Sequence, residues 1–300
     1  MAKLKACLIA GVLLLGSVAF AVEPEEAGEL APEASFPVKD RDPSNPFGKV
    51  KTPSRGTVKV IGGYSAGCIA GAEKMSISGP GWEIVRVSRN RMYGHPILLG
   101  LLKRAGATVA PGASPMIVGD MSQPRGGPMT SGHTSHQTGL DVDIWFQTLP
   151  SGTQMTDELR ETLPLVSVLG PDFKSVDPKK WNKEYERLLL WFAQQPEVER
   201  IFVNAAIKKM LCAAYPGDIR LKKLRPWYAH DEHFHVRLAC PAGQKDCVPQ
   251  KPVDDIECED EHFAYWFSDE VIDALKNPPP PRPAQTVYLP AACRDVVKAP

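Results

Sequence analysis

The chain has 300 residues, and its 35 Lys and Arg residues balance its 35 Asp and Glu residues. This balance provides no overall field to attract nucleic acid or an anionic membrane, so we expect neither as a partner. Hydrophobic residues make up 43% of the chain and charged residues 23%, which excludes a disordered chain. The function must therefore come from a local site.

Residues 1–21 have the features of a cleavable signal peptide. Lys3 and Lys5 give a positive start, the apolar run 6–20 follows, and Ala19 and Ala21 supply the small-x-small pattern of a cleavage site. The run is shorter than the ~20 residues that a membrane-spanning helix needs. We therefore expect export with cleavage after Ala21 and no membrane span in the mature chain.

An even number of cysteines remains after that cleavage. The six are Cys68, Cys212, Cys240, Cys247, Cys258 and Cys293. In an exported chain this count predicts three disulfides in an oxidising compartment, but the spacing does not choose among the possible pairings. No C-x-x-C pair occurs, so metal binding by cysteine is disfavoured.

Prolines gather at the two ends of the chain. Six of the 29 lie in residues 24–53 and nine in residues 249–300. We therefore predict an irregular N-terminal segment at 22–54, a compact domain at 55–248, and a proline-rich C-terminal segment at 249–300 that disulfides fasten.

Within the compact domain, some segments show the two-residue hydrophobic period of a strand and others show the period of a helix. Strand-like segments are predicted at 57–61, 82–87 and 201–203, and helices at 96–103, 183–195 and 205–214. The order has no regular βαβ rhythm, which favours an α+β fold over a doubly wound one. We expect a small antiparallel central sheet that carries the functional site, flanked by helices and long disulfide-tied loops.

The placement of histidines is the strongest functional signal. Five of the seven lie in two short segments, 131–143 and 230–235. The five are His133, His136, His230, His233 and His235. Such clustering in a neutral chain predicts a metal site rather than isolated surface or core histidines.

Strand geometry limits how the first segment can bind a metal. On one helix His136 and Asp143 would be separated by a rise of ~10 Å, too far for two bonds of ~2 Å to one ion. Gly139 instead predicts a turn, after which apolar and polar residues alternate as in a strand. Asp141 and Asp143 then lie on the polar face.

The second segment alternates in the same way. His233, His235 and Arg237 share one face of a predicted strand, and the opposite face is apolar. If the two strands are neighbours, their polar faces converge. Because residues two apart on one face are ~6.5–7 Å apart, we expect one of the two histidines to bind the metal and the other to serve as a base.

Two nitrogen ligands and one oxygen ligand with an open fourth position are typical of catalytic rather than structural zinc. Such zinc acts as a Lewis acid and activates water, which suits amide hydrolysis. Asp141 is a candidate for orienting a ligand, and His230 for stabilising the developing oxyanion. The alternative for each of these two residues is that it is a solvated loop residue with no role in the site.

The motif H-x6-D followed by H-x-H resembles the zinc peptidases that include lysostaphin-type enzymes, D-Ala-D-Ala metallopeptidases and hedgehog domains. The longer strings at 124–144 and 225–238 resemble the penicillin-insensitive murein endopeptidase family. The resemblance extends over residues 62–267.

This resemblance implies a zinc peptidase domain with zinc held by His136, Asp143 and His235. It implies His233 as the catalytic base and His230 as an active-site histidine. His133 matches a family histidine that helps to hold a second metal, whose other partners are expected near 167–177. That region contains Asp172 but no histidine.

The resemblance also implies disulfides Cys68–Cys293, Cys212–Cys258 and Cys240–Cys247. The implied activity is that of a DD-endopeptidase, insensitive to penicillin. Its implied substrate is the D-alanyl to meso-diaminopimelyl cross-link between peptidoglycan peptides in a Gram-negative periplasm. No sequence feature identifies a protein partner.

Two other functions remain as alternatives. Residues 63–67 fit the G-x-S-x-G pattern, in which Ser65 would be the nucleophile of a serine hydrolase. The chain could instead be a cell-wall binding module that keeps zinc but has lost turnover. Retention of His233 argues against that second alternative.

Overall fold

The structure is a computed structural model that describes residues 35–150, 152–253 and 255–300. The predicted signal peptide at 1–21 and the first part of the predicted N-terminal segment lie outside these residues. Among the described residues, no helix is both long and apolar enough to cross a membrane.

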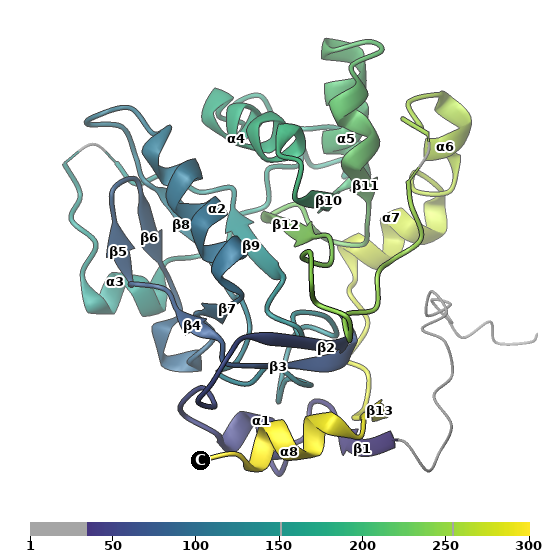
Figure 1. The fold of residues 1–300 in the computed structure, drawn as a ribbon. Coiled ribbons are helices and arrows are strands. Elements are labelled where there is room, and N and C mark those ends of the chain that lie inside the picture. The colour runs from purple at the N-terminus through teal and green to yellow at the C-terminus, as the bar shows by residue number, and fades with distance from the viewer. Residues whose placement is uncertain (1–34, 151, 254) are drawn as a thin grey trace, which may run out of the picture.

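A seven-stranded mixed sheet forms the centre of the molecule (Figure 1). Its spatial order is β11-β10-β12-β9-β8-β6-β5. In chain order the strands are β5 (Ser78–Gly79), β6 (Trp82–Ile84), β8 (Met116–Val118), β9 (Asp141–Trp145), β10 (Val198–Val203), β11 (Leu224–Pro226) and β12 (His233–Leu238). The pairs β10–β11 and β6–β8 are parallel, and the others are antiparallel.

The predicted α+β class is confirmed. The central strands β9, β12 and β10 are antiparallel, as expected, but the sheet is larger than predicted and mixed. The short strands β5 and β8 carry too few residues to give a clear alternating pattern, so sequence periodicity did not reveal them.

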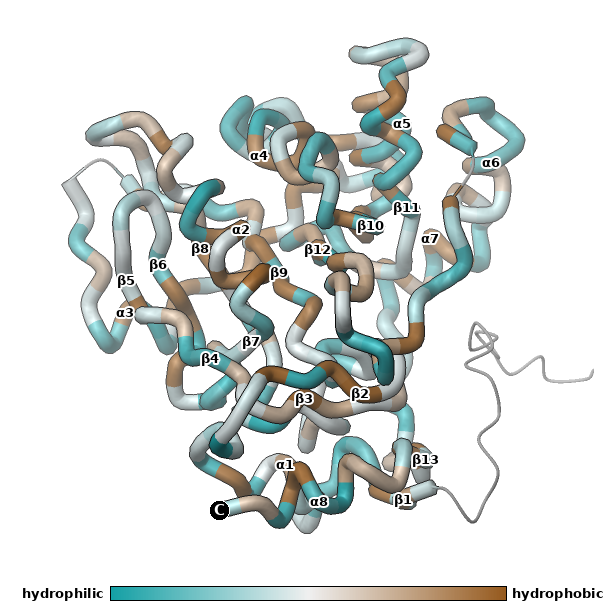
Figure 2. The backbone as a smooth tube through the Cα atoms, in the orientation of Figure 1, coloured by the Kyte–Doolittle hydropathy of each residue, from teal (hydrophilic) through white to brown (hydrophobic). Residues whose placement is uncertain are grey.

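Three helices pack on the apolar face of this sheet: α2 (Pro96–Ala107), α4 (Lys183–Gln194) and α5 (Ala205–Ala214). Val142 and Ile144 of β9 and Phe234 and Val236 of β12 are buried in the same core as the apolar faces of these helices. The hydrophobic stretches of the central strands are brown in Figure 2. Since alternate residues of a strand point to opposite faces, burying these four side chains directs the aspartates and histidines between them to the other face.

The remaining elements surround this core. The strands are β1 (Ser35–Lys39), β2 (Lys59–Gly63), β3 (Ala66–Ala70), β4 (Glu73–Lys74), β7 (Tyr93–Gly94) and β13 (Thr286–Pro290). The α-helices are α1 (Pro46–Lys49), α3 (Asp157–Thr162), α6 (Asp260–Ala264), α7 (Asp269–Lys276) and α8 (Ala292–Lys298). Short 3-10 helices occupy Val87–Arg89 and Ile219–Lys223.

The two ends of the described chain lie side by side (Figure 1). Strand β1 pairs antiparallel with β13, and a second core of buried residues joins Phe47 and Leu289 to Cys68 and Cys293. Both end segments are therefore more regular than their proline content indicated, because each end supplies the strand that the other needs. The predicted boundaries at residues 55 and 248 stay predictions.

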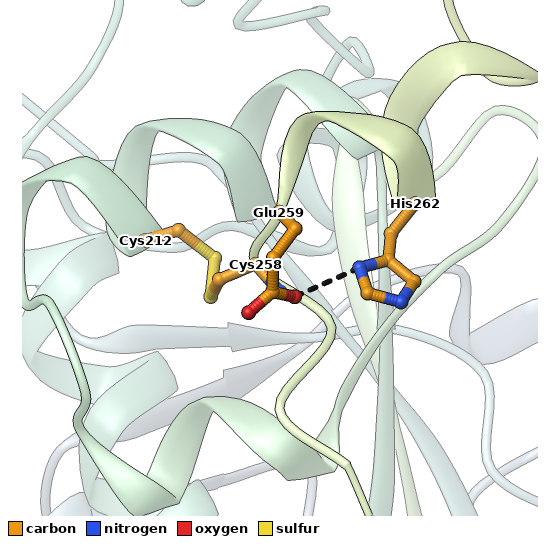
Figure 3. Close-up of a disulfide and its surroundings, with 4 residues drawn as sticks. All are labelled: Cys212, Cys258, Glu259 and His262. Carbon is orange, nitrogen blue, oxygen red and sulfur yellow. Dashed lines mark hydrogen bonds and ion pairs between the residues drawn. A yellow bond between two sulfur atoms is a disulfide. The ribbon is translucent and has the colours of Figure 1, made fainter.

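Three disulfides connect the cysteines in the pairs that the family resemblance implied. They are Cys68–Cys293, Cys212–Cys258 and Cys240–Cys247. Cys212–Cys258 attaches helix α5 to the segment before α6, next to an ion pair between Glu259 and His262 (Figure 3). The C-terminal segment is thus fastened at two separate points.

The Cys68–Cys293 disulfide is expected to stabilise the fold more than Cys240–Cys247. The first closes a loop with a sequence separation of 225 and the second one of 7. In the chain-entropy description this corresponds to about 5 against about 2 kcal/mol. Urea unfolding of the Ser-for-Cys double variants measures the difference, and equal losses would contradict the entropic explanation.

Candidate metal centre

The centre is built where strands β9 and β12 pair. Their register places His235 opposite Asp143 and Arg237 opposite Asp141. Directly paired residues point to the same face of a sheet, with Cβ atoms ~4.5–5.5 Å apart. The expectation that the two polar faces converge is confirmed, and the centre lies on the face opposite the helical core.

His136 reaches this face from the loop that precedes β9. Its backbone is in the left-handed region, with φ of 64°, and Gly139 follows with φ of 71°. Gln137 holds the loop against the β2–β3 hairpin, because its side-chain amide donates to Ser65 O and accepts from Gly67 N. These two hydrogen bonds hold the neighbouring residue His136 in its uncommon backbone conformation.

Four histidine nitrogens surround the carboxylate of Asp143. His136 Nε2, His235 Nδ1 and His233 Nε2 lie 3.4, 3.5 and 3.7 Å from Asp143 Oδ1. His133 Nε2 lies 3.4 Å from the other oxygen, Oδ2. These separations exceed the ~2.7–3.2 Å usual for a hydrogen bond. The distances of 3.4 and 3.5 Å agree with the ~3.3–3.5 Å expected between two ligand atoms of one tetrahedral zinc ion, whereas the 3.7 Å distance to His233 is longer.

The buried polar atoms of the centre fit a metal ion. His136 is fully buried, yet neither of its ring nitrogens makes a hydrogen bond, and Asp143 Oδ1 also has no hydrogen-bond partner. Buried polar groups without partners are costly and rare. A cation between these atoms supplies the missing interaction, and imidazole nitrogen with carboxylate oxygen is a donor set that zinc accepts.

His133, His136 and Asp143 form a group that could hold a metal ion, with one donor atom from each lying within 4.8 Å of the others. His235 approaches the same carboxylate from strand β12, with its ring centroid 4.5 Å from that of His136. The structure therefore brings together all the predicted ligand residues.

Asp141, the predicted orienting group, contacts the ring nitrogen of His235 that points away from Asp143. Its Oδ1 is 2.6 Å from His235 Nε2 and accepts a hydrogen bond of 2.6 Å from Arg237 Nε. Burial opposes ionisation, but Arg237 and His235 outweigh it and hold the pKa of Asp141 well below its ordinary value. An ionised Asp141 accepts the proton on Nε2, so the Nδ1 that faces Asp143 carries a free lone pair.

The other two histidines of the second cluster lie beside this pair. His230 Nδ1 is 2.7 Å from Tyr228 O, which it can approach only as a donor, and its ring centroid is 4.9 Å from that of His233. Burial and the neighbouring His233 lower the pKa of His230 to about 3, and burial also lowers the pKa of His233. Both rings are therefore neutral near pH 7, each with one nitrogen able to accept a proton.

Sequence reasoning missed Asp120. It is 4% exposed, and its Oδ2 contacts His133 Nε2 at 3.1 Å, Arg91 Nη1 at 2.8 Å and Arg89 Nη1 at 3.1 Å. The signal in the sequence was its position two residues after the buried apolar strand Met116–Val118. No histidine lies near Asp120 in the sequence, so the clustering did not include it.

Two other predictions are corrected by the geometry. Ser65 lies in the tight turn of the antiparallel hairpin β2–β3, not between a strand and a helix, so the nucleophile-elbow interpretation is wrong. Asp172, the candidate partner for a second metal, instead caps an exposed turn by accepting hydrogen bonds from Lys174 N and Ser175 N.

An α+β fold with a buried histidine–carboxylate group able to hold a metal defines a candidate metallohydrolase. A family model described as penicillin-insensitive murein endopeptidase matches residues 60–298. The chain belongs to this family of peptidases.

Proteins with that same name are similar over most of their length. The protein from Klebsiella pneumoniae subsp. pneumoniae is 38% identical over 245 residues, covering 80% of this chain and 89% of its own. The Haemophilus influenzae protein is 38% identical, covering 84% and 88%. The Pectobacterium atrosepticum protein is 40% identical, covering 79% and 86%.

Replacing Asp141 by Ala is expected to destabilise the metal-free protein by about 3–5 kcal/mol, because Arg237 would remain buried without its partner. The exposed pair Arg187–Glu184 provides the control, since Glu184→Ala should cost less than about 1 kcal/mol. Denaturant unfolding in the presence of a chelator measures both. A small loss for Asp141→Ala would show that this buried pair contributes little.

Proposed function

We propose that this chain is a zinc-dependent murein DD-endopeptidase that hydrolyses the D-alanyl to meso-diaminopimelyl cross-link of peptidoglycan. One observation carries the proposal: in a chain of this family, Asp143 Oδ1 lies 3.4 and 3.5 Å from nitrogens of His136 and His235. These are the separations expected of ligands to one zinc ion.

In this proposal His136, Asp143 and His235 hold the zinc. His136 and Asp143 Oδ1 lack other hydrogen-bond partners, and Asp141 orients His235 so that its Nδ1 faces Asp143. Zinc bound there supplies Lewis acidity at the scissile carbonyl and a lowered pKa of the attacking water. Histidine and carboxylate donors would also accept other divalent ions.

His233 is the proposed general base. Its Nε2 lies 3.7 Å from Asp143 Oδ1, close enough to take a proton from a water at the centre without displacing a ligand. It pairs across the sheet with Trp145, two residues along the strand from the His235–Asp143 pair. This spacing along β12 separates the base from the ligand.

His230 is the proposed second active-site histidine. Because Nδ1 donates to Tyr228 O, only Nε2 of its ring is available to the reaction. In the neutral form Nε2 accepts rather than donates a proton. His230 therefore has to gain a proton, for example from the imidazolium of His233 beside it, before it can stabilise an oxyanion.

The proposed location is the periplasm, reached with a signal peptide cleaved after Ala21. Three disulfides support an oxidising compartment outside the cytoplasm. Peptidoglycan peptides are the proposed substrate, because the relatives are named murein endopeptidases.

The mature protein is expected to convert cross-linked muropeptide dimers into monomers, each cut at the D-alanyl to diaminopimelyl amide. A chelator should abolish the conversion and added zinc should restore it. Mass spectrometry of the digest measures the products. A folded, zinc-loaded protein that leaves the dimers uncut would favour the binding-module alternative.

Replacing His233 by Ala is expected to lower kcat about 10²- to 10⁴-fold, because it removes the base without removing a ligand. Zinc content, measured by elemental analysis, should stay near the wild-type value. His262→Ala is the matched control, since His262 lies beside the Cys212–Cys258 disulfide and contacts Glu259 rather than Asp143 (Figure 3). Unchanged turnover in His233→Ala would exclude His233 as the base.

A further inference from the structure

A hollow lined by aromatic side chains lies between the loop that precedes β12, the start of helix α5 and helix α7. Its volume is about 240 Å³, and it is open to solvent. The rings of Tyr228 and Trp266 meet in its lining with centroids 5.1 Å apart. Five of its nine lining residues are aromatic: Phe173, Trp227, Tyr228, Trp266 and Phe267. The lining includes none of the histidines and aspartates of the metal centre.

The hollow is nevertheless continuous with that centre. The ring of Phe202 lies 5.3 Å from the ring of His235 on one side and 5.6 Å from the ring of Trp227 on the other, measured between centroids. Tyr228, the next residue, accepts the hydrogen bond from His230 Nδ1 at its backbone oxygen. A group bound in the hollow can therefore belong to the same substrate molecule as an amide bound at the centre.

The far wall of the hollow comes from the C-terminal segment. Phe267 follows helix α6, and the Cys212–Cys258 disulfide attaches the start of α6 to helix α5 (Figure 3). Lys209 of α5 adds a second connection, because its ammonium group lies 5.5 Å from the centre of the Phe267 ring. The wall is thus held in place before any ligand arrives, as in most ligand sites.

The hollow and its border combine exposed rings with an uncharged lining. Trp227 is 41% exposed, and Tyr265, whose ring contacts that of Trp266, is 50% exposed. Among the nine described residues that line the hollow, none has a charged side chain. Nearby polar groups come from Lys174, next to Phe173 in the chain, and its exposed partner Asp269. Exposed aromatic surface of this kind marks a place where a ligand is bound.

The chemistry of a murein substrate selects the ligand. Its stem peptides carry free carboxylates and amines, whereas the N-acetylated sugars of its glycan strand have neutral rings. The face of a sugar ring presents C–H groups, which pack on the negative face of an aromatic ring, and its hydroxyl groups lie at the edge, where water and polar side chains can reach them. An uncharged aromatic hollow therefore suits the sugar, because a charged peptide would lose its hydration there without gaining a partner.

We propose that this hollow is a glycan subsite, which binds a neutral N-acetylated sugar ring of the strand that carries the cross-linked peptide. The C-terminal segment then has a function besides closing the fold, since it supplies one wall of the subsite. The enzyme consequently favours peptides that are still joined to glycan over free peptides. This inference rests on the proposed function, because it takes murein as the substrate.

The first test uses chitotetraose, a peptide-free oligomer of N-acetylglucosamine, in calorimetric titrations of the mature protein. The zinc-loaded and the chelator-treated wild type should bind it equally, because the hollow contains no metal ligand. Trp227→Ala should weaken binding about tenfold through loss of one stacked ring, and Trp227→Phe should restore most of the affinity. The matched control is Tyr288→Ala, since Tyr288 is 59% exposed in strand β13 and should not affect binding.

The second test compares two forms of the cross-linked dimer, one with its disaccharides and one from which an amidase has removed them. The wild type should cut the sugar-bearing dimer with a KM about tenfold lower and a similar kcat, because the subsite contributes uniform binding. In Trp227→Ala the ratio of the two KM values should fall to about one, and in Tyr288→Ala it should equal the wild-type ratio.

Several outcomes would overturn the inference. They are a folded wild type that does not bind chitotetraose, a folded Trp227→Ala that binds it as the wild type does, and displacement of chitotetraose by the free stem peptide. Thermal unfolding establishes that each variant is folded, and Tyr265→Ala, at an exposed ring beside the hollow, gives the readout if Trp227→Ala is not. A wild type that binds chitotetraose but cuts neither dimer would instead overturn the proposed function.

Discussion

The centre depends on the register between β9 and β12. This register pairs His235 with Asp143 and Arg237 with Asp141. It therefore places the proposed ligands His235 and Asp143 side by side and gives Asp141 an arginine partner. A slip of one residue would turn every one of these side chains toward the helical core. The register is strongly specified because Val142, Ile144, Phe234 and Val236 on the opposite face are buried in that core. Packing of the apolar face thus determines which polar side chains lie next to each other on the opposite face.

The two buried aspartates of β9 differ in role because their surroundings differ. Asp141 is matched by Arg237, whose guanidinium group is covered by the rings of Tyr64 and Phe202. Asp143 has only imidazole rings near Oδ1. A buried carboxylate that already has a guanidinium partner is satisfied, whereas one that has only imidazole rings around its oxygen can still accept a cation. The difference in charge compensation therefore distinguishes Asp141, the proposed orienting residue, from Asp143, the proposed ligand two positions away.

The ends of the chain contribute to the same centre from a distance. Strands β1 and β13 and the Cys68–Cys293 disulfide hold the β2–β3 hairpin, and the hairpin holds Gln137 next to His136. Arg125 adds a second connection, since its guanidinium donates to backbone oxygens of the C-terminal helix α8 at Val296 and Val297. The loop that supplies His136 is thus supported by residues more than a hundred positions away in the sequence.

The sequence by itself determined the local elements and the identities of the candidate ligands. Alternation in 140–146 and 233–238 predicted both strands, and the clustering of histidines predicted which residues gather at the candidate metal centre, because both signals are local in the chain. The full width of the mixed sheet, the pairing of the two ends and the contact of Asp120 with His133 were decided only by the tertiary structure. Strands of two or three residues leave little periodic pattern, and a proline-rich end forms a strand only when its partner end is present. The contacts of Asp120 with Arg91 and with His133 join separate segments of the chain, so they exist only after the chain has folded.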